Sequence, residues 1–146
     1  MNEHQTEVTC KLRFIDYIVD RIEFENNSQF NADSAEIELA ISHEVVMKSL
    51  DAYVTLHLKI FPDAIINNYP FSFSVSVTGH FQIDADDNDE TKPFLNVNAV
   101  AILFPYVRAL VTTYTANANV PPLILPPMNI AKMLEKNAKE LSANSE

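Results

Sequence analysis

Glycine, cysteine, tryptophan and positive charge are scarce in this chain of 146 residues. The only glycine is Gly79, which excludes the GxGxxG loop and the P-loop, because each of these motifs needs more than one glycine. The only cysteine is Cys10, so no disulfide framework forms within one chain. No local motif marks Cys10 as a nucleophile, and we expect an inert thiol. Common nucleotide-binding motifs and disulfide-stapled folds are therefore excluded.

Acidic residues outnumber basic ones by 20 to 10, and the net charge is −10. A surface of this sign repels phosphate backbones and anionic lipids, so we expect neither nucleic acid nor a membrane as a partner. The N-terminal residues lack the apolar stretch of a signal peptide. The uncharged apolar run 99–107 is shorter than the roughly 20 residues that span a bilayer, and predicts a buried helix. We expect one cytoplasmic domain, residues 1–146, with disordered tails at 1–10 and 142–146.

The first half of the chain predicts antiparallel strands. Apolar and polar residues alternate strictly over 49–61, where Leu50 begins the inward set, and again over 69–84. Such a period of two is typical of strands with one buried face. A shorter alternation over 36–43 predicts a third strand with Ile37, Leu39 and Ile41 inward. The segment 62–70 predicts a loop between the two long strands.

The segment 12–24 predicts the first strand, and its first half is apolar on both faces. Strict alternation places Phe14 and Ile18 on one face and Ile15, Tyr17 and Val19 on the other. A small domain with its helices on one side of the sheet leaves the other face of this strand uncovered. We expect that surplus apolar surface to meet another subunit.

The second half predicts helices. Apolar residues from Val100 to Tyr114 follow the spacing of one helix face, and residues 117–119 end that helix. Pro105 either begins the regular helix or kinks it, and the sequence leaves both open. The segment 120–127, VPPLILPP, is too rich in proline for a helix and predicts an extended, stiff connection. Asn129 then predicts the N-cap of a last helix. The order predicts an α+β fold, a four-stranded antiparallel sheet followed by two C-terminal helices packed on one face.

Residues with catalytic or metal-binding chemistry form no recognisable constellation. His4, His43, His57 and His80 show no zinc-ligand spacing, and we expect the three in strands to face solvent. The acidic run 84–90 lacks the glycine and the glutamate of a calcium-binding loop. We therefore expect no enzyme, no metal and no cofactor.

What stands out instead is apolar. Leu123, Ile124 and Leu125 lie within the proline-rich segment, and Phe24 and Phe30 flank the loop after the first strand. Core packing explains such residues in many proteins. The alternative is an apolar groove for extended peptides, which a rigid proline frame holds open without an ordering cost on binding.

Residues 99–134 carry a pattern that resembles the SecB family of chaperones. The shared features are Ile102 to Tyr106 (ILFPY) with Arg108, the proline-rich segment after the helix, and Gly79-His80-Phe81 in the last strand. The resemblance implies a homotetramer, built as a dimer of dimers, that binds unfolded polypeptide clients in extended form along hydrophobic grooves. It implies that the groove is lined by Phe24, Phe30, Tyr114, Val120, Leu123, Ile124, Leu125 and Met128.

Two roles are open within that family. Export members dock the motor SecA through acidic residues on the sheet, and Glu25 matches one such position, whereas Arg21 and Ser74 at two others carry no carboxylate. Other relatives protect the antitoxin of a toxin–antitoxin pair. A different class is also open, an oligomeric assembly module that uses up its apolar surface and binds no client.

Overall fold

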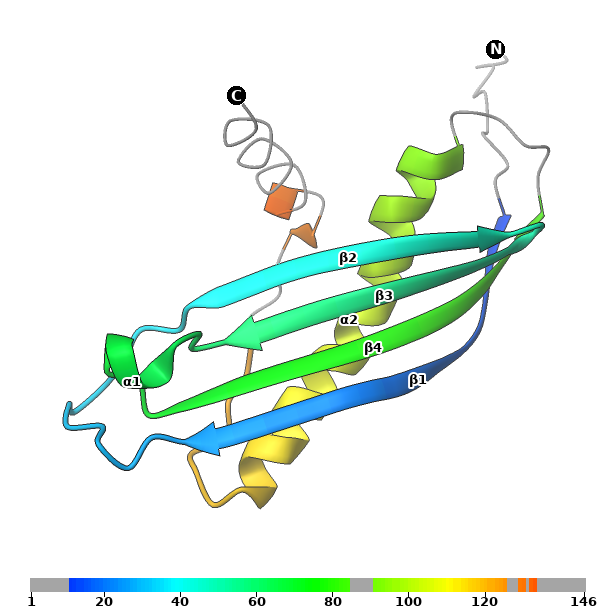
Figure 1. Ribbon diagram of the computed structural model, residues 1–146. Coiled ribbons are helices and arrows are strands. Elements are labelled where there is room, and N and C mark those ends of the chain that lie inside the picture. Colours follow the sequence, from blue (N-terminus) through cyan, green and yellow to red (C-terminus); the bar gives the residue numbers. More distant parts are fainter. Residues whose placement is uncertain (1–10, 85–90, 126–128, 131, 134–146) are drawn as a thin grey trace, which may run out of the picture.

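The computed structural model describes residues 11–84, 91–125, 129–130 and 132–133. It consists of one twisted four-stranded sheet with a long helix packed diagonally across one face (Figure 1). The α+β class is confirmed. The predicted tails, His4, Cys10, Met128 and most of the predicted last helix lie outside the described residues.

The sheet has the order β1-β4-β3-β2, and every neighbouring pair is antiparallel. Its strands are β1 (Lys11–Asn26), β2 (Leu39–Lys48), β3 (Asp51–Ile60) and β4 (Phe71–Asp84). The strand predicted over 36–43 begins and ends later, and Ile37 lies exposed ahead of it. Leu50 was predicted inward and is exposed, because it lies in the β2–β3 turn next to Ser49, whose φ is 57°.

Two β-bulges change which way the side chains of β1 face. The register of β1 against β4 shifts between Phe14 and Asp16 and again between Val19 and Arg21. Each extra residue inverts the alternation that follows it. Phe14 and Tyr17 therefore lie on the same, helix-covered face, where both rings pack on Tyr106 with centroids 5.6 and 4.8 Å away. The predicted opposition of Phe14 and Tyr17 is wrong.

A helix of one turn, α1 (Ala64–Asn67), interrupts the predicted loop between β3 and β4. The long helix α2 (Thr91–Asn117) ends where the sequence predicted and continues through Pro105. The alternative in which proline begins the helix is therefore wrong. An interior proline removes one backbone hydrogen bond, so packing against the sheet outweighs the local preference.

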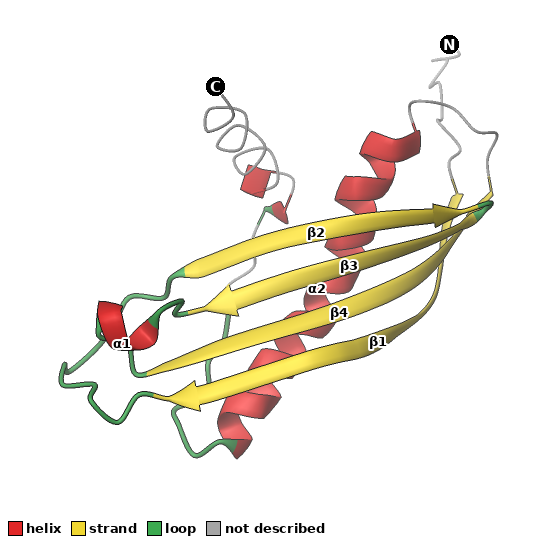
Figure 2. Cartoon of the chain, in the orientation of Figure 1, coloured by secondary structure: helices red, strands yellow, loops and turns green. Residues whose placement is uncertain are grey.

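The core lies between α2 and the sheet (Figure 2). Inward side chains of β3 and β4 meet one stripe of α2, whose buried apolar members are Ala99, Val100, Leu103, Phe104, Val107 and Val111. The helix predicted to be buried is therefore buried along one stripe, and Tyr106 on another side is 40% exposed. The stretch Asn96–Asn117 has the length and mean hydropathy, 1.3, of a membrane span, and 39% of the tested window is buried in this fold.

Gly79 permits the close approach of α2 to β4. A Cβ built at Gly79 would lie 2.7 Å from Leu103 Cδ2 and 2.8 Å from Phe81 Cε2, closer than nonbonded carbons tolerate. The scarce glycine is thus used for packing and not for a turn.

Candidate functional site

A continuous row of aromatic rings runs across one end of the sheet on its helix-covered face. Phe24 of β1 contacts Tyr114 of α2 with centroids 5.8 Å apart, and Tyr114 also contacts Phe73 of β4 at 5.3 Å. Phe24 further contacts Phe71 at 5.2 Å. We call these residues, with the two rings that continue the series, the aromatic row: Phe24, Phe61, Tyr69, Phe71, Phe73 and Tyr114.

The aromatic row is buried at its base and open at its rim. Phe61, Phe71 and Phe73 are buried. Phe24 is half-buried, and Tyr114 is 37% exposed. Two of the predicted groove residues, Phe24 and Tyr114, are therefore brought into contact and remain accessible.

The described part of the proline-rich connection, residues 120–125, is the second element of the site and is called the proline segment. Val120 and Leu123 are half-buried and pack against the core. Ile124 is 75% exposed, whereas Leu125 is only 1% exposed. The segment thus shows Ile124 to solvent, and Leu125, which the resemblance placed in the groove, is a core residue.

Two threonines of α2 fix the proline segment to the helix. Thr112 Oγ1 donates a hydrogen bond to the carbonyl oxygen of Leu123 at 2.9 Å, and the N–H of Leu123 donates to Thr115 Oγ1 at 2.9 Å. The Thr115 hydroxyl in turn donates to the carbonyl oxygen of Val111 at 2.8 Å. Thr115 is fully buried, so these bonds are shielded from competing water. We call this pair the threonine clamp.

The loop after β1 is fixed in a similar way by Asn27. Its buried side-chain amide donates to the carbonyl oxygens of Ala64 and Tyr69 at 3.2 and 2.9 Å, and its side-chain oxygen accepts from Gln29 N at 3.0 Å. Phe30 follows in this loop and is half-buried. Among the described ring contacts, none joins Phe30 to the aromatic row.

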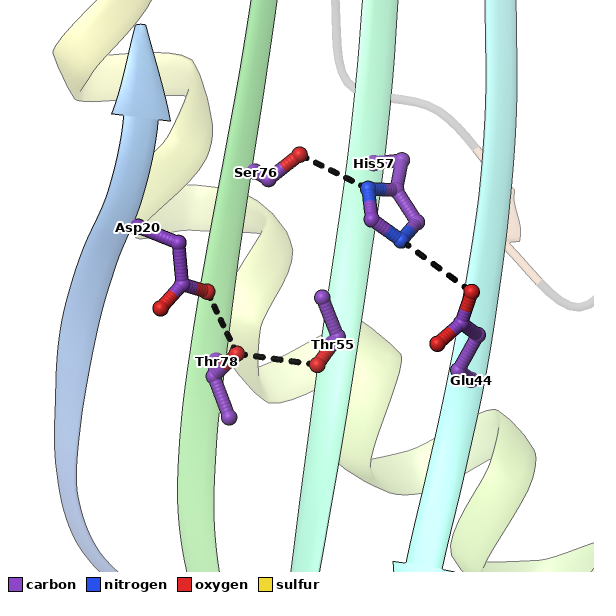
Figure 3. A network of polar contacts seen from close by, with 6 residues as sticks. All are labelled: Asp20, Glu44, Thr55, His57, Ser76 and Thr78. Carbon is purple, nitrogen blue, oxygen red and sulfur yellow. Dashed lines mark hydrogen bonds and ion pairs between the residues drawn. The ribbon is translucent and has the colours of Figure 1, made fainter.

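The face of the sheet that α2 leaves open carries a network of polar contacts across its middle. Figure 3 shows His57 between Ser76, at 2.7 Å, and Glu44, at 3.6 Å, and it shows Thr78 between Thr55 and Asp20. These contacts link all four strands. They pair neighbouring polar side chains across strands, as is usual on the solvent-exposed face of a sheet.

His80 and Asp51 form a second pair on the open face. The His80 Nε2 and Asp51 Oδ1 atoms are 2.8 Å apart, and the His80 ring stacks on Tyr53. The hydrogen bond with His80 lowers the pKa of Asp51 below its ordinary value. Within the described part of the chain, no three His, Cys, Asp or Glu side chains gather as metal ligands.

Glu25 is exposed at the end of β1, on the open face. It lines two adjoining hollows of about 440 and 720 Å³, and Asp63 and Ser72 line both as well. Arg21 is paired with Glu23. The carboxylates of Glu25 and Asp63 thus lie at one end of the sheet, and Lys59 lines the larger hollow with them.

The threonine clamp and the buried part of the aromatic row were not predicted. Phe71 and Phe73 were recognised as inward strand residues but not as partners of Tyr114. Thr112 and Thr115 are three residues apart, a spacing that places two side chains on one helix face. No local signal says that this face meets the proline segment.

Comparison with known proteins gives a consistent picture. The family model described as "Preprotein translocase subunit SecB" matches residues 14–141. An uncharacterized protein of Methanocaldococcus jannaschii is 37% identical over 143 residues, which cover 94% of this chain and 91% of that protein. The protein-export protein SecB of Nitrosomonas europaea is 31% identical over 133 residues, which cover 91% of this chain and 74% of that protein.

Two solved structures share the fold. One is a SecB-like chaperone of Mycobacterium tuberculosis in complex with a ChAD peptide from an antitoxin, with a TM-score of 0.66 at 18% identity, covering 80% of this chain and 90% of that one. The other is a protein of unknown function from Streptococcus agalactiae, with a TM-score of 0.54 at 13% identity, covering 82% of this chain and 100% of that one. At these identities the likeness concerns the fold.

Proposed function

The chain belongs to the SecB family of chaperones, and we therefore propose that it is a cytoplasmic holdase that binds unfolded polypeptides in extended form. The observation that carries the proposal is the open rim of the aromatic row together with the exposed Ile124, whose neighbour Leu123 is bonded to the same turn of α2 that carries Tyr114. Large apolar side chains left in water next to a rigid frame are typical of a surface that receives a partner. No catalytic step is part of this proposal.

The proposed groove runs between the rim of the aromatic row and the proline segment. Phe24 and Tyr114 supply aromatic surface, and Ile124 supplies the exposed aliphatic side chain. Val120, Leu123 and Phe30 contribute their half-buried surfaces, and Leu125 supports the segment from the core. Met128, also implied by the resemblance, lies outside the described residues. Apolar contacts of this kind read little sequence, which suits many different clients.

The proposed cellular role is either protein export or the protection of an antitoxin. Relatives named as protein-export proteins support the first, and the peptide bound by the Mycobacterium tuberculosis structure supports the second. The carboxylates of Glu25 and Asp63 suit a basic partner such as a docking segment of SecA. We propose a homotetramer, a dimer of dimers, as the working form.

Calorimetric titration with reduced, carboxymethylated α-lactalbumin, which stays unfolded in buffer, tests the holdase directly. We expect binding of this unfolded protein and no binding of native α-lactalbumin. Equal heats with both forms, or none with either, would overturn the proposal.

Two matched variants then locate the groove. Ile124→Asp places a charge at the proposed contact, and Ile66→Asp places one at the exposed turn α1, where Ile66 is 85% exposed. Because burying an isoleucine is worth about 1.5–3 kcal/mol, we expect the Ile124 change to weaken client binding roughly tenfold or more. The Ile66 change should leave the affinity as it is. The same loss in both variants would move the groove away from the proline segment.

An assembly module without clients is the second candidate function. The observation in its favour is Ile18, which lies on the open face of β1 and is 63% exposed. If oligomerisation consumes the apolar surface, light scattering should give a compact oligomer that binds no apolar dye. Dye binding that unfolded α-lactalbumin displaces would decide for the holdase.

A further inference from the structure

The main chain of the proline segment has a defined orientation around Leu123. Both polar main-chain groups of Leu123 are bonded to the threonine clamp, the carbonyl to Thr112 and the N–H to Thr115. A residue whose N–H and C=O point the same way has the extended geometry of a strand. The helix therefore plays the part of a neighbouring strand on one side of this segment.

Peptide geometry then dictates which groups point the other way. The described chain has no cis peptide bond, and the C=O and N–H of a trans peptide point in opposite directions. Because the Leu123 carbonyl points at α2, the N–H of Ile124 points away from α2. Because the Leu123 N–H points at α2, the carbonyl of Pro122 also points away.

These two groups form an isolated pair. Pro121 and Pro122 have no N–H, and Leu125 is buried in the core. Ile124 is the exposed residue of the segment with an N–H to donate, and no bond joins that N–H to another described residue. The segment thus offers one donor and one acceptor, on either side of Leu123, next to the exposed side chain of Ile124.

We propose that the Pro122 carbonyl and the Ile124 N–H form a single docking point for polypeptide main chain. The ligand class is an extended peptide of any sequence, whose own N–H and C=O would complete the two hydrogen bonds of one β-ladder rung. The inference rests on the proposed function, since the extended peptide is the unfolded client.

The prolines limit the docking point to one rung. A long free strand edge pairs with other chains and promotes aggregation, and proline blocks that pairing because it donates no hydrogen bond. A holdase needs contact with the client main chain without building a sheet on it. One rung beside an apolar contact meets both needs, and the threonine clamp holds that rung in its outward orientation.

Amide hydrogen exchange of the ¹⁵N-labelled protein, with and without saturating carboxymethylated α-lactalbumin, tests the proposal. In the free protein we expect slow exchange at Leu123 and fast exchange at Ile124. The client should slow exchange at Ile124 on the order of tenfold or more and leave Leu123 unchanged. Tight client binding with unchanged exchange at Ile124 would overturn the docking point and leave the holdase standing. Absence of client binding would overturn the holdase and the docking point together.

A pair of variants tests the donor by affinity. Ile124→Ala keeps the N–H and Ile124→Pro removes it, while both lose the isoleucine side chain. We expect the proline variant to bind the client about 2- to 10-fold more weakly than the alanine variant, as for the loss of one hydrogen bond. Slow exchange at Leu123 in the free proline variant would show that the threonine clamp is intact. Equal affinities of two variants with intact clamps would overturn the proposal.

Discussion

Two irregular connectors of this molecule are held in place by hydrogen bonds from side chains of other elements. The two connectors differ in whether their own residues favour the backbone conformation. The β3–β4 connector, residues 61–70, has three non-glycine residues in the left-handed region, Phe61, Asp63 and Asn68, with φ of 54–55°. Such residues cost about 1–2 kcal/mol each, less for asparagine. The proline segment instead uses residues whose φ is set by their own rings.

Asn27 and the threonine clamp therefore have different roles in the two connectors. Asn27 holds a connector whose backbone is locally unfavourable, through bonds to the Ala64 and Tyr69 carbonyls. The threonine clamp orients a segment that is already extended, through the bonds to Leu123. We therefore expect a side-chain hydrogen bond from another element to stabilise a connector most where the local sequence disfavours the backbone conformation.

The largest expected effect is that of Asn27→Ala. The change leaves the Tyr69 carbonyl and the Gln29 N–H without their partner, and we expect the free energy of unfolding to fall by about 2–3 kcal/mol. Urea unfolding measures it. The neighbouring, exposed Asn26→Ala is the control and should change stability by less than about 0.5 kcal/mol. Similar losses in both would mean that Asn27 does not hold the connector.

Thr115→Val should have a smaller effect on the proline segment. The isosteric change removes the acceptor of the Leu123 N–H, and we expect a loss of about 1–2 kcal/mol in unfolding free energy. Exchange of the Leu123 amide should become faster. Thr113→Val, at an exposed position two residues earlier, serves as the matched control. A loss in Thr115→Val as large as that in Asn27→Ala would contradict the comparison.

Backbone substitutions should act with opposite signs on the two connectors. Asp63→Gly relieves a left-handed residue that makes no side-chain cap bond, and we expect it to stabilise the protein by about 0.5 kcal/mol. Pro122→Ala frees the unfolded chain and should destabilise by about 0.5–1 kcal/mol. Thermal and urea unfolding of both variants would show the signs. If both variants changed the free energy of unfolding with the same sign, the proposed difference between the two connectors would be wrong.

The smallest expected effect is a pH dependence confined to the β3–β4 connector. The Tyr69 hydroxyl donates a hydrogen bond to Glu38, and this bond raises the pKa of Tyr69 above its ordinary value. Because the folded state holds this proton more tightly, the contribution is present below about pH 10 and is lost as the pH rises through the folded pKa. Unfolding curves between neutral and alkaline pH should show a decline that Tyr69→Phe reduces. The proline segment has no titratable side chain and should add nothing.

The local elements of this protein and its family could be predicted from its residues alone. Alternation over 49–61 and 69–84 predicted β3 and β4 with their inward side chains. Successive side chains of a strand point to opposite faces, so a half-buried strand alternates between apolar and polar residues. Asn129 was predicted as an N-cap, and its side-chain oxygen accepts a hydrogen bond from Lys132 N at 3.1 Å. The SecB-like pattern of residues 99–134 was confirmed by the family match.

The fold, and no local pattern, sets which way the side chains of β1 face, the side of the proline segment on which Ile124 lies, and the contact of Phe24 with Tyr114. Each depends on a partner distant in the chain: β4 for the bulges, Thr112 and Thr115 for the segment, and α2 for the aromatic row. Local periodicity reports which residues share a face, but contact with a distant element decides which partner that face meets. The candidate site is made of such contacts, and for that reason its residues could be proposed from the sequence and its geometry could not.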